Sequence, residues 1–158
     1  MTDQPQNTSR AGKPKWLKKR LPSGSAFEQI RASLRQSSLN TVCQEAKCPN
    51  IWECFSSRTA TFLIMGPHCT RNCRFCAVGH GPTDPPDPDE PLRVAEAAKG
   101  MGLAYVVVTS VTRDDLHDGG AVFFAKTIQE IRVALPDAQV EVLIPDFQGN
   151  ADALRTVL

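Results

Sequence analysis

The sequence has no long apolar run and almost no net charge. Residues 1–21 contain no apolar stretch that could form the core of a secretory signal, and no segment approaches the length of a membrane span. Eighteen Lys and Arg residues against seventeen Asp and Glu leave a formal charge of +1, which points to neither nucleic acid nor a membrane as a partner. These absences favour a location in the reducing cytoplasm.

Six cysteines stand out against this background, all of them between residues 43 and 76. A chain of 158 residues can bury a hydrophobic core and does not depend on disulfides for its stability. In a reducing compartment, clustered cysteines more often bind metal or carry out redox chemistry than form cross-links. They form two triplets: "CQEAKCPNIWEC" contains Cys43, Cys48 and Cys54, and "CTRNCRFC" contains Cys69, Cys73 and Cys76.

Apolar strands that alternate with amphipathic helices predict an α/β fold with a parallel sheet of right-handed βαβ units. The expected elements are helices over residues 25–35, 91–101, 121–135 and from 151 onward, and strands over residues 59–66, 103–110 and 140–145. Ser25 and Glu28 form a capping-box pair at the start of the first helix. The strand around residues 140–144 is expected to present an unpaired apolar edge, which favours aggregation.

The sequence divides into three parts. Residues 1–24 are polar and include the basic run "KPKWLKKRL", which fits a disordered arm in solvent or a segment that docks onto an acidic partner. Residues 25–57 form an N-terminal extension with the first triplet. In it, a helical turn from about residue 41 should end at Pro49, and Asn50 with Glu53 should cap the next turn. Residues 58–158 form the α/β core.

The second triplet follows the first strand of this core. In parallel α/β folds the loops after the carboxyl ends of the strands form the active site, so these cysteines should meet the loops after the two later strands. A helix would spread Cys69 and Cys76 over about 10.5 Å of axis, so the segment should be a loop that wraps around its ligand. Three thiolates suit a [4Fe–4S] cluster with one open iron, while a zinc site with His68 or His80 remains the alternative.

The C-x3-C-x2-C spacing of "CTRNCRFC" resembles that of radical S-adenosylmethionine (SAM) enzymes, and Phe75 stands where these enzymes usually have an aromatic residue. The resemblance implies that Cys69, Cys73 and Cys76 hold three irons of a [4Fe–4S] cluster, whose fourth iron binds SAM. An electron from the cluster would then cleave SAM to methionine and a 5′-deoxyadenosyl radical. The candidates for the wall around SAM and the substrate are Phe75, Thr109, Ser110, Arg113, Asp114 and Asp115.

The C-x4-C-x5-C spacing of the first triplet narrows the resemblance to the lipoyl synthase family. Shared segments include "TATFLIMG", "VVVTSVTRDDLHDGGA" and "VLIPDFQGN", in which Gln148 replaces the usual Arg. The implied fold is a partial (β/α) barrel of the radical SAM type, with about three βα units in this chain and an N-terminal cluster-binding extension. Cys43, Cys48 and Cys54 would hold an auxiliary [4Fe–4S] cluster that supplies sulfur.

The reaction implied by this resemblance is the insertion of two sulfurs into the octanoyl chain on a lysine of a lipoyl carrier domain. The implied partners are E2 subunits of 2-oxoacid dehydrogenases, the glycine cleavage H protein, and an electron donor such as ferredoxin or flavodoxin. Radical attack on unactivated C–H bonds needs no Ser/His/Asp triad or paired acids. No nucleic-acid or membrane partner is expected.

Two alternatives remain open at this point. The family's barrel has more βα units than this sequence, and the serine ligand of the family's auxiliary cluster is a residue that the sequence does not reach. The chain therefore also fits a catalytically incomplete protein that only binds iron–sulfur clusters. The first triplet also fits a small zinc knuckle that braces the N-terminal extension.

Overall fold

The structure, a computed structural model, describes Pro14 and residues 25–57 and 59–158. The basic run at residues 13–21 lies outside the described residues except for Pro14, and so does the side chain of Ser25, on which the expected capping box depends. The division of the chain at residues 24 and 57 stays a prediction. No helix in these described ranges is both long and apolar enough to cross a membrane.

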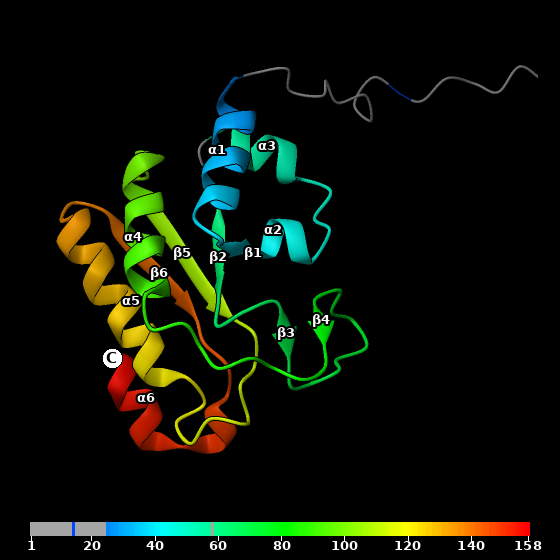
Figure 1. Ribbon diagram of the computed structural model, residues 1–158, viewed down its shortest axis with the longest axis vertical. Coiled ribbons are helices and arrows are strands. Elements are labelled where there is room, and N and C mark those ends of the chain that lie inside the picture. The colour runs from blue at the N-terminus through cyan, green and yellow to red at the C-terminus, as the bar shows by residue number, and fades with distance from the viewer. Residues whose placement is uncertain (1–13, 15–24, 58) are drawn as a thin grey trace, which may run out of the picture.

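A four-stranded sheet organises the described chain (Figure 1). Its order is β1-β2-β5-β6, in which β2, β5 and β6 run parallel and β1 pairs antiparallel with β2. Ile64 lies opposite Ser110 and Thr109 lies opposite Leu143, so the carboxyl ends of the parallel strands meet at one edge. This confirms the predicted α/β class with a parallel sheet. The strands are β1 (Asn40–Thr41), β2 (Thr61–Ile64), β5 (Tyr105–Ser110) and β6 (Gln139–Leu143).

Helices α4 and α5 lie side by side along the sheet, and α6 packs against α5 (Figure 1). On α5, Phe124 and Ile131 are completely buried and Ile128 and Leu135 pack against the core, which confirms the predicted apolar stripe. On β5, the valines that face these helices are also completely buried. The helices are α4 (Glu90–Gly100), α5 (Ala121–Ala134) and α6 (Ala151–Val157), all close to their predicted bounds.

The N-terminal extension packs through aromatic side chains. Phe27 stacks on Trp52 with 4.2 Å between ring centroids and lies 5.6 Å from the ring of Phe55. Leu34 and Phe55 are completely buried, and they belong to the same hydrophobic core as the sheet. The extension therefore shares one core with the rest of the chain. Its helices are α1 (Ser25–Gln36), α2 (Val42–Glu45) and α3 (Ile51–Ser56).

Two expectations about the extension were wrong. Helix α2 ends at Glu45, and Lys47 then adopts a left-handed conformation with φ of 51°, so the helix stops before it reaches Pro49. Asn50 precedes α3 but makes no side-chain capping hydrogen bond; its backbone carbonyl accepts the N–H groups of Glu53 and Cys54, the first hydrogen bonds of the helix. Thr41 caps the start of α2, since its hydroxyl accepts the N–H of Gln44.

The strand predicted over residues 59–66 is shorter than expected. It ends at Ile64 because Met65 and Gly66 both have positive φ, 66° and 94°. After this turn come β3 (His68–Cys69) and β4 (Gly79–His80), a short parallel pair that the sequence did not predict. At the other side of the main sheet, β6 has β5 as its neighbour among the described strands, which confirms the predicted strand edge.

Candidate metal centre

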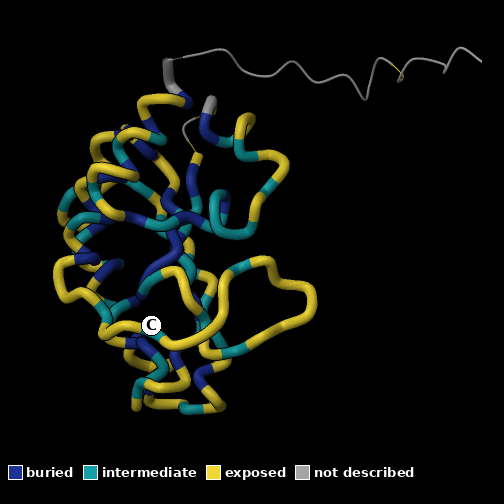
Figure 2. The backbone as a smooth tube through the Cα atoms, turned by 45° about the vertical axis from the view of Figure 1, so that its right-hand side comes forward, coloured by how far each residue is buried: buried dark blue, intermediate teal, exposed yellow. Residues whose placement is uncertain are grey.

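The second triplet lies on the segment that joins β3 to β4. Residues 70–78 contain no helix, which confirms the predicted loop, and Figure 2 shows them as a largely exposed loop that extends away from the packed body. Cys73 and Cys76 are exposed, and a turn joins them through the Cys76 N–H and the Cys73 carbonyl at 3.0 Å. Cys69 is half-buried at the foot of the loop.

The thiol of Cys69 accepts two backbone hydrogen bonds. The N–H of Thr112 lies 3.2 Å from Sγ, and the N–H of Arg71 lies 3.4 Å from it. Backbone donors of this kind suit a sulfur that carries negative charge, as a metal-bound thiolate does. Because Thr112 follows β5, one of the two bonds also ties Cys69 to the neighbouring strand.

Thr70 makes a second connection between the loop and β5. Its N–H and its hydroxyl both donate to the carbonyl of Thr112, at 3.1 and 2.9 Å. The N–H of Asp114 in turn donates to the Thr70 hydroxyl at 3.2 Å. The first turn of the cysteine loop is therefore held against the segment that leaves β5.

Arg71 links the loop to two carboxylates. Nε and Nη2 donate to the two oxygens of Asp114 at 2.6 and 2.8 Å, and Nη1 and Nη2 donate to those of Asp146 at 2.8 and 2.9 Å. These bonds lower the pKa of Asp146 to about 2. They also lower the pKa of Asp114, to which the side chain of Gln148 adds a smaller contribution, and they raise that of Arg71. Asp114 follows β5 and Asp146 follows β6.

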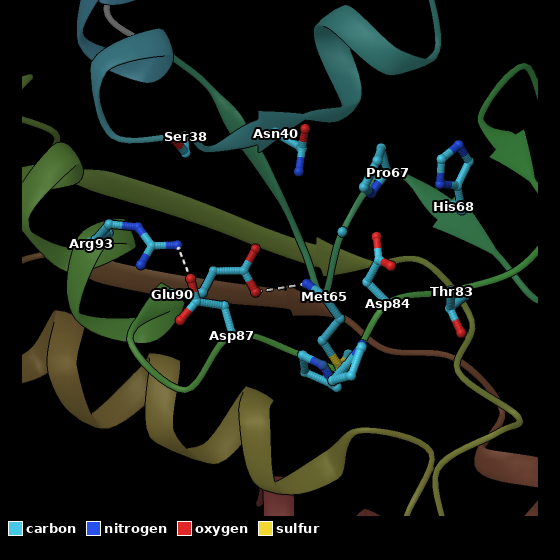
Figure 3. A pocket seen from close by; sticks show the side chains of 13 residues that line it. Ser38, Asn40, Met65, Pro67, His68, Thr83, Asp84, Asp87, Glu90 and Arg93 are labelled. Atoms are coloured by element: carbon cyan, nitrogen blue, oxygen red, sulfur yellow. Dashed lines mark hydrogen bonds and ion pairs between the residues drawn. The ribbon is translucent and has the colours of Figure 1, made fainter.

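Met65, at the end of β2, is held from both sides by buried charged residues. Its N–H donates to the carboxylate of Glu90 at 2.7 Å, as Figure 3 shows, and its carbonyl accepts from Arg113 Nη1 at 3.2 Å. Burial raises the pKa of Glu90, which the Met65 N–H partly opposes. A Cβ on Gly120 would approach the sulfur of Met65 to 2.3 Å, so a side chain at this position would force the Met65 side chain to move, and φ of +90° there favours glycine. Together these contacts fix where the chain enters the cysteine loop.

Arg113, a predicted SAM contact, is 1% exposed. Its guanidinium donates to both oxygens of Asp115 at 2.9 and 2.7 Å and to the carbonyl of Asp84 at 3.0 Å. The bonds with Arg113 lower the pKa of Asp115 to about 2, with a further contribution from Thr83. Both predicted residues therefore have intramolecular partners, and Arg113 also connects the end of β2 to the segment after β5 through the Met65 carbonyl.

The other predicted SAM contacts differ in whether their side chains are already engaged within the protein. The hydroxyl of Thr109 donates to the carbonyl of Leu143 at 2.8 Å, and Phe75 is 93% exposed on the cysteine loop. Ser110, the last residue of β5, has a buried hydroxyl with no hydrogen-bond partner in the described ranges. A buried polar atom without a partner is uncommon in a native protein, where an ordered water or a ligand usually supplies the missing bond.

The first triplet lies on and beside α2 and α3. Cys43 and Cys48 line a cavity of about 400 Å³ beneath these helices, together with Phe27 and Trp52. Burial raises the pKa of Cys43, and the neighbouring thiols of Cys54 and Cys48 raise it further, while the N–H of Thr61 lowers it. The thiols of this triplet are therefore near enough to influence one another electrostatically.

A second cavity, of about 190 Å³, lies between the extension and the end of β2 (Figure 3). Asn40, His68 and Asp84 line it, and the Glu90 carboxylate points to Met65 at its edge. His68, an alternative zinc ligand in the sequence, thus faces this cavity.

All six cysteines are free thiols. Among residues 14, 25–57 and 59–158, no three His, Cys, Asp or Glu side chains converge closely enough to hold one metal ion. Neither triplet is a preformed metal site. The donor set still fits an iron–sulfur cluster, because each triplet offers three unpaired thiols and Cys69 already accepts the N–H bonds that stabilise a thiolate.

Sequence reasoning missed three residues that shape the site: Arg71, Glu90 and Asp146. One signal for the ion pair was available, since Arg71 and Asp146 both fall in loops after parallel strands and carry opposite charges. Topology alone brings such loops to the same edge of the sheet. No sequence signal indicates that Glu90 turns inward to the Met65 N–H.

Comparison with known proteins places these features in a family. Residues 2–48 match the sequence model of the N-terminal domain of lipoyl synthase of the radical SAM family, and residues 63–157 match that of the radical SAM superfamily. The chain is 60% identical to the lipoyl synthase of Desulfotalea psychrophila over 149 residues, which are 94% of this chain and 50% of that protein. It is 62% identical to that of Nitratidesulfovibrio vulgaris over 145 residues, 92% of this chain and 49% of the relative.

A third relative, the lipoyl synthase of Caldanaerobacter subterraneus, is 61% identical over 146 residues, 92% of this chain and 51% of that protein. The chain thus spans about half the length of the curated relatives it matches. The superfamily match extends over more than half of the chain, and it includes the second triplet and helices α4, α5 and α6. The chain therefore belongs to the radical SAM superfamily.

Proposed function

We propose that this chain carries the cluster-binding part of a sulfur-inserting enzyme of the lipoyl synthase type. The observation that carries the proposal is the second set of cysteines. The superfamily match includes one triplet, whereas Cys43 and Cys48 of the other lie in residues 2–48, which match the N-terminal domain of lipoyl synthase. Cys54 follows six residues after Cys48. An auxiliary cluster on these residues would supply sulfur.

Radical SAM lipoyl synthases use SAM and [4Fe–4S] clusters. When bound and reduced, these cofactors supply a 5′-deoxyadenosyl radical, which removes hydrogen from C–H bonds that no general base can ionise. In this chain, Cys69, Cys73 and Cys76 would hold the radical cluster. Ser110 would donate to or accept from SAM through its unpartnered hydroxyl, and Phe75 would cover the cluster side.

The remaining predicted SAM residues would act as supports of this wall. Arg113 links the segment after β5 to the end of β2 through the carbonyl of Met65. Asp115 pairs with Arg113 and Asp114 pairs with Arg71, so these charges are compensated within the protein. Thr109 fixes β5 to β6 through the carbonyl of Leu143. In a partial (β/α) barrel of the radical SAM type, these supports would keep the site closed to water on one side.

The proposed substrate is an octanoyl chain, amide-linked to a lysine of a lipoyl carrier domain, which would gain two sulfurs. The carriers would be E2 subunits of 2-oxoacid dehydrogenases and the glycine cleavage H protein, and the electron would come from ferredoxin or flavodoxin. The six free thiols fit a reducing compartment such as the cytoplasm.

A second candidate is a protein that binds both clusters but does not insert sulfur. The chain spans about half the length of the relatives that carry the lipoyl synthase name, so sulfur insertion needs a test separate from cluster binding. Among the described strands β6 is paired on one side only, and Leu143 at its end is 54% exposed.

Anaerobic reconstitution tests the proposal. About eight irons with matching sulfide per chain are expected, and replacing either triplet by alanines should remove about half of them. Stoichiometric zinc instead of iron would overturn the proposal for the triplet that binds it. Incubation with dithionite, SAM and an octanoylated carrier, followed by mass spectrometry, separates the two candidates: a gain of two sulfurs with loss of two hydrogens supports sulfur insertion, and 5′-deoxyadenosine without that product supports the second candidate.

A further inference from the structure

We propose that Arg71 is a positioning residue, which holds the loop of the second triplet against the ends of β5 and β6 in the geometry that the radical cluster requires. The inference rests on the proposed function, because it concerns the site assigned to that cluster. Arg71 lies between Cys69 and Cys73 in sequence. A change in the backbone torsion angles of Arg71 therefore changes the position of Cys69 relative to Cys73.

The geometry of the side chain is specific. Arg71 meets Asp114 and Asp146 with two bonds each, and the three residues belong to the loops that follow β3, β5 and β6. A planar guanidinium satisfies two carboxylates in this way only when both lie near its plane, so the contacts fix direction as well as distance. One side chain thus connects three loops that are separated by 43 and 75 positions along the chain.

The ion pairs of Arg71 are partly exposed, so we expect them to orient the loop more than to stabilise the fold. The side chains of Arg71, Asp114 and Asp146 are 33%, 29% and 62% exposed. Water screens ion pairs of this kind, and such pairs contribute little to the free energy of unfolding. Loss of Arg71 should therefore leave the fold intact and release the loop.

The backbone of Arg71 acts directly on a cysteine. Its N–H donates to Sγ of Cys69, beside the N–H of Thr112. Hydrogen bonds to the sulfur ligands of an iron–sulfur cluster shift its reduction potential and its retention of iron. We call the bonds of the Arg71 guanidinium to Asp114 and Asp146 the clamp. Because the clamp and the N–H donor belong to the same residue, the clamp restricts the position of that N–H relative to Cys69.

The test compares Arg71→Gln with Arg74→Gln. Arg74 lies in the same loop, is exposed, and has no side-chain hydrogen bond or ion pair in the described structure, so it matches the change in charge without the change in contacts. Both variants are made together with Cys48→Ala, which leaves the second triplet as the complete one. The readouts are the rate of iron loss to a chelator, the midpoint potential of the cluster, and thermal unfolding of the metal-free chain.

Arg71→Gln is expected to lose iron about 10- to 100-fold faster than Arg74→Gln and to shift the midpoint potential, while the two variants unfold at similar temperatures. Arg71→Lys should give an intermediate rate, because an ammonium group keeps the charge but cannot bridge two carboxylates bidentately. Equal iron retention and equal potentials in the Gln variants would overturn the inference, even if both bind a cluster.

Amide hydrogen exchange on the metal-free chain separates this inference from the proposed function. Without the clamp, the N–H groups of Thr70 and Asp114, which bond across the loop, should exchange about tenfold faster in Arg71→Gln and remain unchanged in Arg74→Gln. If the parent chain takes up no iron at the second triplet, the proposed function and the role toward the cluster both fail. Unchanged exchange in Arg71→Gln would show that the bonds of Arg71 do not hold the loop, whatever the chain binds.

Discussion

The two cysteine triplets are held by different kinds of structure. Cys43, Cys48 and Cys54 lie on or next to short helices that pack through the stacked rings of Phe27 and Trp52 into the hydrophobic core. The second triplet lies on an exposed loop without helix, whose first turn is fixed by hydrogen bonds and ion pairs to the ends of other strands.

Different forces order the two sites. Burial of apolar surface orders the first triplet, so its geometry should follow the overall stability of the protein. Polar contacts between loops order the second, so its geometry can change while the fold remains. A cluster that must bind a small cofactor fits the second arrangement, because a loop held at its foot leaves its far side open to solvent.

The largest expected effect separates the chemistry of the two sites. Cys73→Ala is expected to abolish reductive cleavage of SAM by the reconstituted chain, because the radical cluster loses a ligand. Cys48→Ala should spare that cleavage, and in a chain with the full length of its relatives it should stop sulfur insertion. Chromatographic measurement of 5′-deoxyadenosine checks the first step, and lipoyl product from the Cys48 variant would contradict the division.

The second prediction tests the packed site. Phe27→Ala should destabilise the chain by about 3–5 kcal/mol, because it removes a buried ring that contacts both Trp52 and Phe55. Chemical denaturation measures the change. Val133→Ala, at a position that is 81% exposed, is the control and should change the free energy of unfolding by no more than about 0.5 kcal/mol. Similar effects from both variants would show that aromatic packing does not order the extension.

The third prediction tests the support of the exposed loop. Gly120→Ala should destabilise the chain by about 1–3 kcal/mol, since φ there is +90° and a Cβ would overlap the Met65 side chain. Gly100→Ala is the matched control, because a Cβ at the end of α4 meets nothing within 4 Å, and it should stabilise by about 0.5–1 kcal/mol. Thermal unfolding distinguishes the opposite signs.

The smallest effect concerns pH. The pKa of Glu90 is raised by burial, so the native state binds a proton more tightly than the unfolded state does. Its contribution to stability is therefore full below the ordinary pKa of glutamate, about 4.3, and is lost as the pH rises through the raised value. Glu90→Gln can still accept the Met65 N–H, so its stability relative to the parent should increase from pH 4 to pH 8.

Glu96→Gln, on the exposed face of the same helix, is the control for this pH dependence. Denaturation at several pH values gives the difference between each variant and the parent. A difference that stays constant with pH for Glu90→Gln would show that the carboxylate is ionised at no cost in the folded chain.

Local patterns in the sequence predicted the helices and strands of the α/β core and the loop of the second triplet. Apolar periodicity is a local feature, and the bounds of α4, α5 and α6 followed from it. The spacing of the three cysteines is local too, and it predicted a loop because a helix would hold Cys69 and Cys76 too far apart. The predicted strand at residues 59–66 was too long, because nothing in its composition indicates that Met65 adopts positive φ.

Contacts between distant loops could not be predicted in the same way. Arg113 was expected to face a ligand, whereas the structure turns it inward, where it bonds to Asp115 and to the carbonyls of Met65 and Asp84. Ser110 was chosen for its place at the end of a strand, and its unpartnered hydroxyl adds a physical reason. Which charged side chains at a sheet edge bond to each other depends on loop paths that a single sequence does not specify.

Met65 has a consequence for how this protein can change during evolution. Its backbone conformation, its N–H, its carbonyl and its side chain are each constrained, the last three by Glu90, Arg113 and Gly120. Replacement of Glu90 or Arg113 leaves a backbone group of residue 65 without its partner, whereas replacement of Met65 keeps both backbone bonds and changes only the side chain beside Gly120. Homologous sequences should therefore keep Glu90 and Arg113 together even where residue 65 varies, and an alignment in which these two residues vary independently would contradict this coupling.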